Sequence, residues 1–274
     1  MTATFRRKMW RRFAVLILVV LSLVSISCKD DEDSDARFTA TSEIDIRARI
    51  TSQSHLTVEA INGIVDITGV SDSDSIVVLG ERIVYSVSQQ SADTHLTELS
   101  VHIQEANNQF WVTTVQPVYT EGCEYNVNYK ITVPENLSVL VRQANGEVLI
   151  RTLGPVTSGR PSAEVDLANG SIGLYDVQGS ILTELSNGTT NVSTQYSELN
   201  LCEVTVVNGT TNVQIPNTIS AYFSAQVIVG TVTVNGLDLR NPVITPTSVT
   251  GTLGSGDGAI AIRGTTGTIT VAGN

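Results

Sequence analysis

An Asn-Gly dipeptide returns at short intervals through this chain, mostly between two stretches of alternating aliphatic residues. The two most similar copies, Ser186-Asn-Gly-Thr-Thr-Asn-Val192 and Val207-Asn-Gly-Thr-Thr-Asn-Val213, share six residues and lie 21 positions apart. The pairs are Asn62-Gly63, Asn145-Gly146, Asn169-Gly170, Asn187-Gly188, Asn208-Gly209 and Asn235-Gly236, and Thr266-Gly267 is a degenerate copy. A unit of about 20 residues built from short β-rich stretches is typical of a solenoid.

Two architectures place Asn-Gly between alternating strands. In an antiparallel meander each pair is a hairpin turn, since Asn and Gly tolerate positive φ. In a solenoid equivalent corners stack, and Asn side chains above one another form hydrogen-bonded ladders, which rewards identity at a fixed period. The sequence therefore predicts an all-β fold, a single-stranded β-solenoid (β-helix) with these pairs as structural turns, and the meander is the alternative.

The expected domain, residues 44–274, has two parts. Residues 44–134 read as strands without clear helix signals, and the alternation from Tyr125 to Val133 predicts one long strand that ends at Pro134. Residues 135–274 hold the Asn-Gly rungs, which become less regular after Pro216. No helix caps the C-terminal strand, Thr268 to Val271, so we expect either covering loops or self-association there.

The first 27 residues read as a lipoprotein signal peptide. Five basic residues precede an apolar stretch from Phe13 to Ile26, which is too short to span a bilayer as a helix. Ser27-Cys28 resembles the end of a bacterial lipobox, although Ser25 replaces the usual Leu. The resemblance implies lipidation of Cys28 and a membrane tether, and an ordinary secretory signal is the alternative.

Residues 28–43 are expected to form an acidic, flexible tether, because they hold too few apolar residues to fold. Lys29 and the acidic residues after it resemble the surface-export signal of Bacteroidota lipoproteins, and a solvated spacer explains them equally well. Without residues 1–27 the chain carries 11 basic and 27 acidic residues, a balance of −16. This charge argues against nucleic acid as a partner.

Chemical motifs are scarce. With Cys28 committed to lipid, Cys123 and Cys202 either pair as a disulfide or stay as buried thiols. No histidine stands in a metal-ligand spacing, and no repeated Asp predicts calcium, so we expect no metal and no cofactor. Carboxylates could meet across rungs in three combinations, namely Glu147 with Glu164, Asp166 with Asp176, and Glu184 with Glu203. We predict no catalytic residues, since isolated outward carboxylates are commoner than catalytic pairs.

The long strand ending in Val133-Pro134, the successive Asn-Gly rungs, the glycine-rich Gly251 to Gly258 and the closing Gly267-Thr-Ile-Thr together resemble the bacterial putative adhesin family. The resemblance implies a β-solenoid of the cell envelope. The expected function is a non-catalytic lipoprotein, anchored at the outer membrane and exposed at the surface, that presents its faces for adhesion or scaffolding to a protein or glycan. The alternative is a polysaccharide-binding or polysaccharide-cleaving β-helix protein.

Overall fold

The computed structural model describes residues 37–195 and 200–274. Within these ranges the chain is all-β, as predicted, and 14 strands join in one large mixed sheet with a single helix, α2 (Gln89–Glu98). The strands are β1 (Phe38–Arg49), β2 (His55–Val70), β3 (Ser75–Ser86), β4 (Ser100–Ala106), β5 (Gln109–Val115), β6 (Glu124–Pro134), β7 (Ser138–Arg151), β8 (Ala163–Tyr175), β9 (Ser180–Ser193), β10 (Leu201–Ile215), β11 (Ala221–Asn235), β12 (Arg240–Thr245), β13 (Ser248–Leu253) and β14 (Gly258–Gly273).

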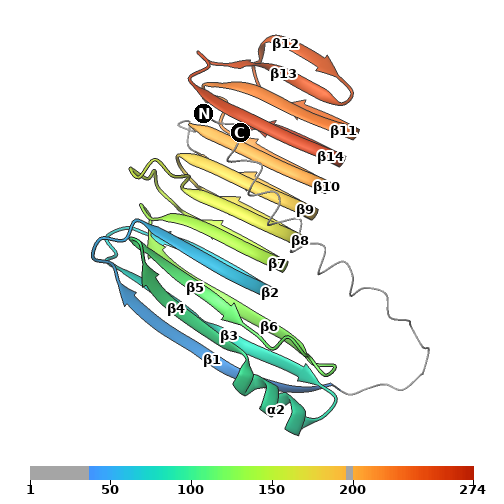
Figure 1. Cartoon of the computed structure of the whole chain (residues 1–274). Helices are drawn as coiled ribbons and strands as arrows, with labels where there is room; N and C mark the ends of the chain where they lie inside the picture. The colour runs from blue at the N-terminus through green and yellow to red at the C-terminus, as the bar shows by residue number, and fades with distance from the viewer. Residues whose placement is uncertain (1–36, 196–199) are drawn as a thin grey trace, which may run out of the picture. The chain divides into compact units, whose positions relative to one another are not determined.

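Seven long strands form a parallel run in the order β2, β7, β8, β9, β10, β14 and β11 (Figure 1). The Asn-Gly pairs lie inside five of these strands and stand in register from Asn62 to Asn208. Each pair therefore continues a strand and does not join two neighbours. The antiparallel meander is excluded for these strands.

The buried face of each strand is continuous across its Asn-Gly pair, because the alternation of buried and exposed side chains shifts there by one residue. In β7 one buried row holds Val139, Val141 and Gln143 before the pair, and Val148 and Ile150 after it. Strictly alternating side chains would put these two sets on opposite faces. Gly146, at φ 127°, turns the backbone so that both halves of the strand face the same core. Strands β2, β8, β9, β10, β11 and β14 show the same shift.

The C-terminal strand does not lie at the edge of the sheet, where it was expected. Strand β14 lies between β10 and β11 and pairs in parallel with both. After β11 the chain forms the hairpin β12–β13, and β13 pairs antiparallel with the first half of β11. The other edge of β11 is therefore available to pair with β14. At this end of the sheet the edge strand is therefore β12, and β1 is the edge at the other end.

The N-terminal part widens the sheet along both halves of β2. The first half of β2 pairs with β5, which pairs with β4, and the second half pairs with β6, followed by β3 and β1. Strand β6 carries the predicted buried row and ends at Pro134, as expected.

Two expectations for this part of the chain were wrong. Helix α2, which was not predicted, follows the N-cap Ser88, whose side chain accepts from the Ser91 amide, and it buries Ala92 and His95. Strand β1 begins at Phe38 and not at residue 44, because it pairs with β3 along its whole length. The predicted signal peptide, Cys28 and the tether up to residue 36 lie outside the described residues.

Among the residues described, no helix has the length and apolar character needed to cross a bilayer.

Candidate functional site

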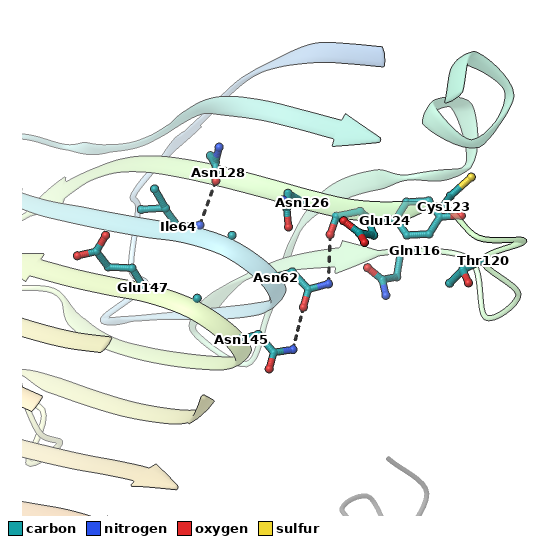
Figure 2. Close-up of a pocket in the computed structure, with 13 residues that line it drawn as sticks. Asn62, Ile64, Gln116, Thr120, Cys123, Glu124, Asn126, Asn128, Asn145 and Glu147 are labelled. Carbon is teal, nitrogen blue, oxygen red and sulfur yellow. Dashed lines mark hydrogen bonds between the residues drawn. The ribbon is translucent and has the colours of Figure 1, made fainter. Parts of the chain in front are cut away.

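The corner asparagines form a hydrogen-bonded ladder along the parallel run. Each side-chain amide donates to the side-chain oxygen of the preceding corner, at 2.8 Å from Asn145 to Asn62, 2.9 Å from Asn169 to Asn145, 2.9 Å from Asn187 to Asn169 and 3.1 Å from Asn208 to Asn187. Asn62 ends the ladder by donating to the Tyr125 carbonyl at 3.1 Å (Figure 2). The ladder predicted from the sequence is confirmed, and every amide donor in it has a partner.

The last predicted turn has a different place. Asn235 ends β11 and Gly236 follows it, outside the row of corners. The corner positions of β11 and β14 are Val229-Gly230 and Thr266-Gly267, which pair with each other. The ladder therefore stops at Asn208, because the next corner residue is a threonine.

A groove of about 710 Å³ lies beside the N-terminal end of the ladder (Figure 2). Its lining is rich in amides and carboxylates, including Gln116, Asn126, Asn128, Glu124 and Glu147. Several of these groups already have partners: Asn128 accepts from the Ile64 amide at 3.1 Å and donates to Glu81, and Glu124 forms an ion pair with Arg37. The groove can offer hydrogen bonds to a polar ligand, but most of its groups serve the fold.

A row of charged side chains runs across the first halves of the parallel strands. Glu59, Arg142, Asp166 and Glu184 are register partners in successive strands. Arg142 lies 3.5 Å from a carboxylate oxygen of Asp166 and 3.7 Å from one of Glu59. Burial and the charge of Glu164 raise the pKa of Asp166, and Arg142 opposes this shift. The charges in the row alternate in sign from Glu59 to Asp166. Asp166 and Glu184 are then two neighbouring negative charges.

The three expected carboxylate combinations fare differently. Glu147 pairs in register with Ser171 and not with Glu164, and Asp166 pairs with Glu184 and not with Asp176. Glu184 and Glu203 occupy adjacent strands, offset along them. None of Asp166, Glu184 and Glu203 lines the groove beside the N-terminal end of the ladder.

Replacing Glu184 by glutamine should stabilise the protein by about 0.5 kcal/mol at pH 7, because like charges opposite each other on a sheet are unfavourable. Desolvation and the charges of Asp166 and Glu203 raise the pKa of Glu184, so folding favours its neutral form. The gain should therefore shrink as pH falls and Glu184 takes up a proton. Urea unfolding at pH 7 and pH 4 measures this. Glu147→Gln, beside Ser171, is the control, and an equal gain from it would contradict the charge argument.

Two of the three histidines are buried and serve the fold. In α2, His95 Nδ1 lies 2.7 Å from Tyr125 Oη, and the His95 side chain is buried. On β2, His55 Nδ1 lies 3.0 Å from Ser138 Oγ and Nε2 lies 3.2 Å from Thr57 Oγ1. Burial and the nearby charge of Arg160 lower the pKa of His55 from 6.5 to about 4.

This shift predicts acid sensitivity. Between pH 6.5 and about 4 the unfolded chain binds a proton at His55 and the folded chain does not, so stability falls as pH falls. The full loss is about 3 kcal/mol, from about 1.4 kcal/mol per pKa unit. His55→Gln should remove this part of the pH dependence of urea unfolding, and His102→Gln, at an exposed site, should not. Parallel pH profiles for His55→Gln and the unmodified chain would contradict the assignment.

The cysteines show no pairing in the described chain. Cys123 and Cys202 are both free and buried. Cys123 Sγ lies 3.2 Å from Ser86 Oγ, and burial raises the pKa of the Cys202 thiol to about 12. This is the buried-thiol alternative.

The glycine-rich loop before β14 binds a side chain of its own chain. The amides of Ser255, Gly256 and Asp257 donate to Ser220 Oγ at 3.0, 2.9 and 3.2 Å. Such convergent amides form the nest in which phosphate-binding loops hold an anion. Here the hydroxyl group fills that position, so the loop fixes the entry to β14. Elsewhere in ranges 37–195 and 200–274, no three His, Cys, Asp or Glu side chains gather to hold a metal.

Comparison with protein-family models gives no match, and comparison with curated proteins gives none either. Among solved structures, the chain is similar to a putative cell adhesion protein from Clostridium sporogenes ATCC 15579, with 11% identity, a TM-score of 0.43, and coverage of 86% of this chain and 100% of that chain.

Two further solved structures show 11% identity and coverage of 84% of this chain. One is a putative adhesin from Bacteroides fragilis NCTC 9343, with a TM-score of 0.27 and 97% of that chain covered. The other is a putative adhesin from Parabacteroides merdae ATCC 43184, with a TM-score of 0.29 and 95% of that chain covered. These names agree with the family that the sequence resembles.

Proposed function

We propose that this chain is a non-catalytic, lipid-anchored protein of the bacterial outer membrane, exposed at the cell surface, whose stacked rungs form a β-solenoid that presents an extended face for adhesion or scaffolding. The observation that carries the proposal is the in-register parallel run from β2 to β11. Such stacks offer long regular surfaces and do not concentrate binding at one site.

The use of polar groups supports a scaffold more than an enzyme. The corner amides donate along the ladder, Ser220 fills the amide nest, and His55 and His95 are held inside the fold. Enzyme sites instead gather groups with shifted pKa values in a cleft. The two groups with raised carboxyl pKa values, Asp166 and Glu184, lie outside the groove beside the ladder.

The proposed anchor precedes the sheet in the sequence. Cys28 lies ten residues before Phe38, where β1 begins at one edge of the sheet, and β12 is the opposite edge (Figure 1). The residue that would carry the lipid therefore comes before every described strand.

Globomycin, which blocks processing of lipoproteins, and proteolysis of intact cells together test the proposal. We expect processing to stop with globomycin or with Cys28→Ala, and added protease to degrade the chain on intact cells. Processing that is unaffected by both treatments would refute the anchor. Complete protection from protease in intact cells, with digestion after lysis, would refute surface exposure.

A second candidate function is polysaccharide cleavage or binding, and the pair Asp166 and Glu184 is the observation that favours it. These carboxylates face each other from adjacent strands, and their raised pKa values suit a proton donor. Release of reducing sugar from a panel of polysaccharides would support this function if Glu184→Gln abolished it. The scaffold predicts no release.

A further inference from the structure

The outward side chains of five adjacent strands share one character beyond their corners. In β8, β9, β10, β14 and β11 (Figure 1), alternate residues after the corner point away from the core, and these positions stand in register across all five strands. They hold hydroxyl, amide and small side chains and one tyrosine, without a charge. We call the outward side of residues 171–175, 189–193, 210–214, 268–272 and 231–235 the polar face.

Charged residues on the other side of the corners show that the stack does not require an uncharged surface. Before their corners, the same five strands carry outward charges on Glu164, Asp166, Glu184, Glu203 and Arg263. Both sides share the same strands, register and spacing, so the backbone accommodates charge on either side. The uncharged composition of the polar face is therefore a feature of the sequence that folding alone does not explain.

One row of the polar face presents a hydroxyl group from every strand. Ser171, Thr189, Thr210, Thr268 and Thr231 are register partners in this order. Within the described part of the chain, the hydroxyl groups of this row have no hydrogen-bond partner. Because neighbouring strands lie about 4.8 Å apart, the row offers a group that can both donate and accept at each such interval.

The row beside it supplies amides as well as hydroxyl groups. Asn191, Asn212, Thr270 and Thr233 follow one another in register, and the Asn212 amide donates to Asn191 Oδ1 at 2.9 Å. This bond holds the two amides in place and leaves N–H groups on both residues, and Asn212 Oδ1, open to a ligand. Donors and acceptors therefore recur over two neighbouring rows.

Tyr175 places an aromatic ring at the β8 end of these rows. A Cβ atom at Gly173 would lie 2.8 Å from Tyr175 Cε2 and 3.2 Å from its hydroxyl oxygen, so the ring lies back over the glycine and against the sheet. Arg151 lies 6.0 Å from the ring centroid, and Tyr175 keeps 36% of its surface exposed. A partly exposed ring held against a polar sheet can pack on the apolar face of a sugar.

We propose that the polar face binds an extended, uncharged polysaccharide of β-1,4-linked hexoses, laid across the five strands with one sugar ring on Tyr175. Sugar hydroxyl groups donate and accept as threonine hydroxyls and amides do, and a sugar residue in such a chain is about as long as the strand interval of about 4.8 Å. A sheet face suits a ribbon-like chain, and the negative charge of the protein opposes acidic polymers. The proposal rests on the proposed adhesion function and names its ligand class.

Isothermal titration calorimetry with cellohexaose tests the polar face, on the full chain in a detergent whose headgroup contains no sugar. We expect Thr210→Val to weaken binding about 5-fold, since one hydrogen bond is lost while the β-branched shape remains. Thr205→Val is the matched control, because Thr205 points outward from the same strand before its corner, and it should leave binding unchanged. Both variants should keep the unmodified melting temperature, since both side chains are only partly buried.

The aromatic contact is tested separately. Tyr175→Ala should weaken the binding of cellohexaose about 10-fold through the loss of stacking. Tyr175→Phe keeps the ring and should bind as the unmodified chain does. Tyr222→Ala is the control, since Tyr222 is 65% exposed on β11 before its corner. Dextran, whose α-linked chain is not an extended ribbon, should not compete with cellohexaose.

The proposal is overturned if cellohexaose does not bind at millimolar concentrations, or if dextran competes with it. Equal losses from Thr210→Val and Thr205→Val, or from Tyr175→Ala and Tyr222→Ala, also overturn it. Loss of binding with Glu184→Gln and not with Thr210→Val would assign the sugar to the pair Asp166 and Glu184 on the other outward side, and would overturn it as well.

The globomycin test of the anchor gives an independent result. A chain that needs processing but binds no cellohexaose loses this ligand and keeps the proposed anchor. A chain that binds cellohexaose but is processed in the presence of globomycin keeps the ligand and loses the anchor.

Discussion

We expect Gly188→Ala to prevent the chain from folding. The new Cβ atom would lie 1.8 Å from the backbone oxygen of Gly170 in the adjacent strand, and the position has φ 139°, which L side chains rarely adopt. Because the obstacle is backbone inside a stacked row, neither partner can move without shifting its own neighbours. We expect a loss of at least about 4 kcal/mol, against a total stability of only about 5–15 kcal/mol for an ordinary domain.

The matched control is Gly159→Ala. Gly159 also has positive φ, at 72°, but no atom lies within 4 Å of the position of its Cβ. Only backbone strain is added there, at a cost of about 1 kcal/mol. Far-UV circular dichroism and urea unfolding compare the two variants. Equal urea midpoints would show that the corners do not pack as closely as the structure has them.

Removal of residues 258–274 should unfold β11, β12 and β13 and leave the strands from β2 to β9 folded. Strand β14 is the partner that β10 and β11 share. Its loss removes four buried aliphatic side chains, Ile260, Ile262, Ile269 and Val271, at about 1.5–3 kcal/mol each. Stacked rungs contact only their neighbours, so the damage should stay on the C-terminal side.

Hydrogen exchange measured by mass spectrometry tests whether the unfolding is confined to β11, β12 and β13. Amides of β11 to β13 should exchange rapidly in the truncated chain, and amides of β7 and β8 should stay protected. Removal of β1, residues 38–49, is the control and should leave β11 to β13 protected. Continued protection of β11 after the loss of β14 would mean that β11 pairs directly with β10.

The rungs were predictable because their signal is local and repeated. An Asn-Gly pair between aliphatic rows indicates a corner, and the return of the same residues indicated that corners stack, which the register from Asn62 to Asn208 confirms. Asn235-Gly236 is the same dipeptide but does not align with the other pairs, because Val229-Gly230 occupies the aligned position in β11. The repeat in the sequence predicts which residues form turns. It does not predict which of those turns align with one another across neighbouring strands.

The missed features depend on contacts between distant segments. Strand β1 starts at Phe38 because β3 supplies its partner, and residues 38–43 hold only two apolar side chains, Phe38 and Ala40. Helix α2 has a serine N-cap but only two buried residues, so it lacks a strong apolar stripe. The opposition of Asp166 and Glu184 follows from the register of β8 and β9, which spacing in the sequence does not reveal.

The ladder of asparagines also has a chemical consequence. In unstructured peptides the glycine nitrogen after an asparagine attacks the side-chain carbonyl carbon and expels ammonia, and water opens the resulting succinimide to aspartate or isoaspartate. In the folded stack each internal carbonyl oxygen accepts from the next asparagine, which holds the group in place. An aspartate at any of these positions could not donate onward. A chain that stays unfolded for long therefore loses asparagines that the ladder needs. Rapid folding protects these residues from that conversion.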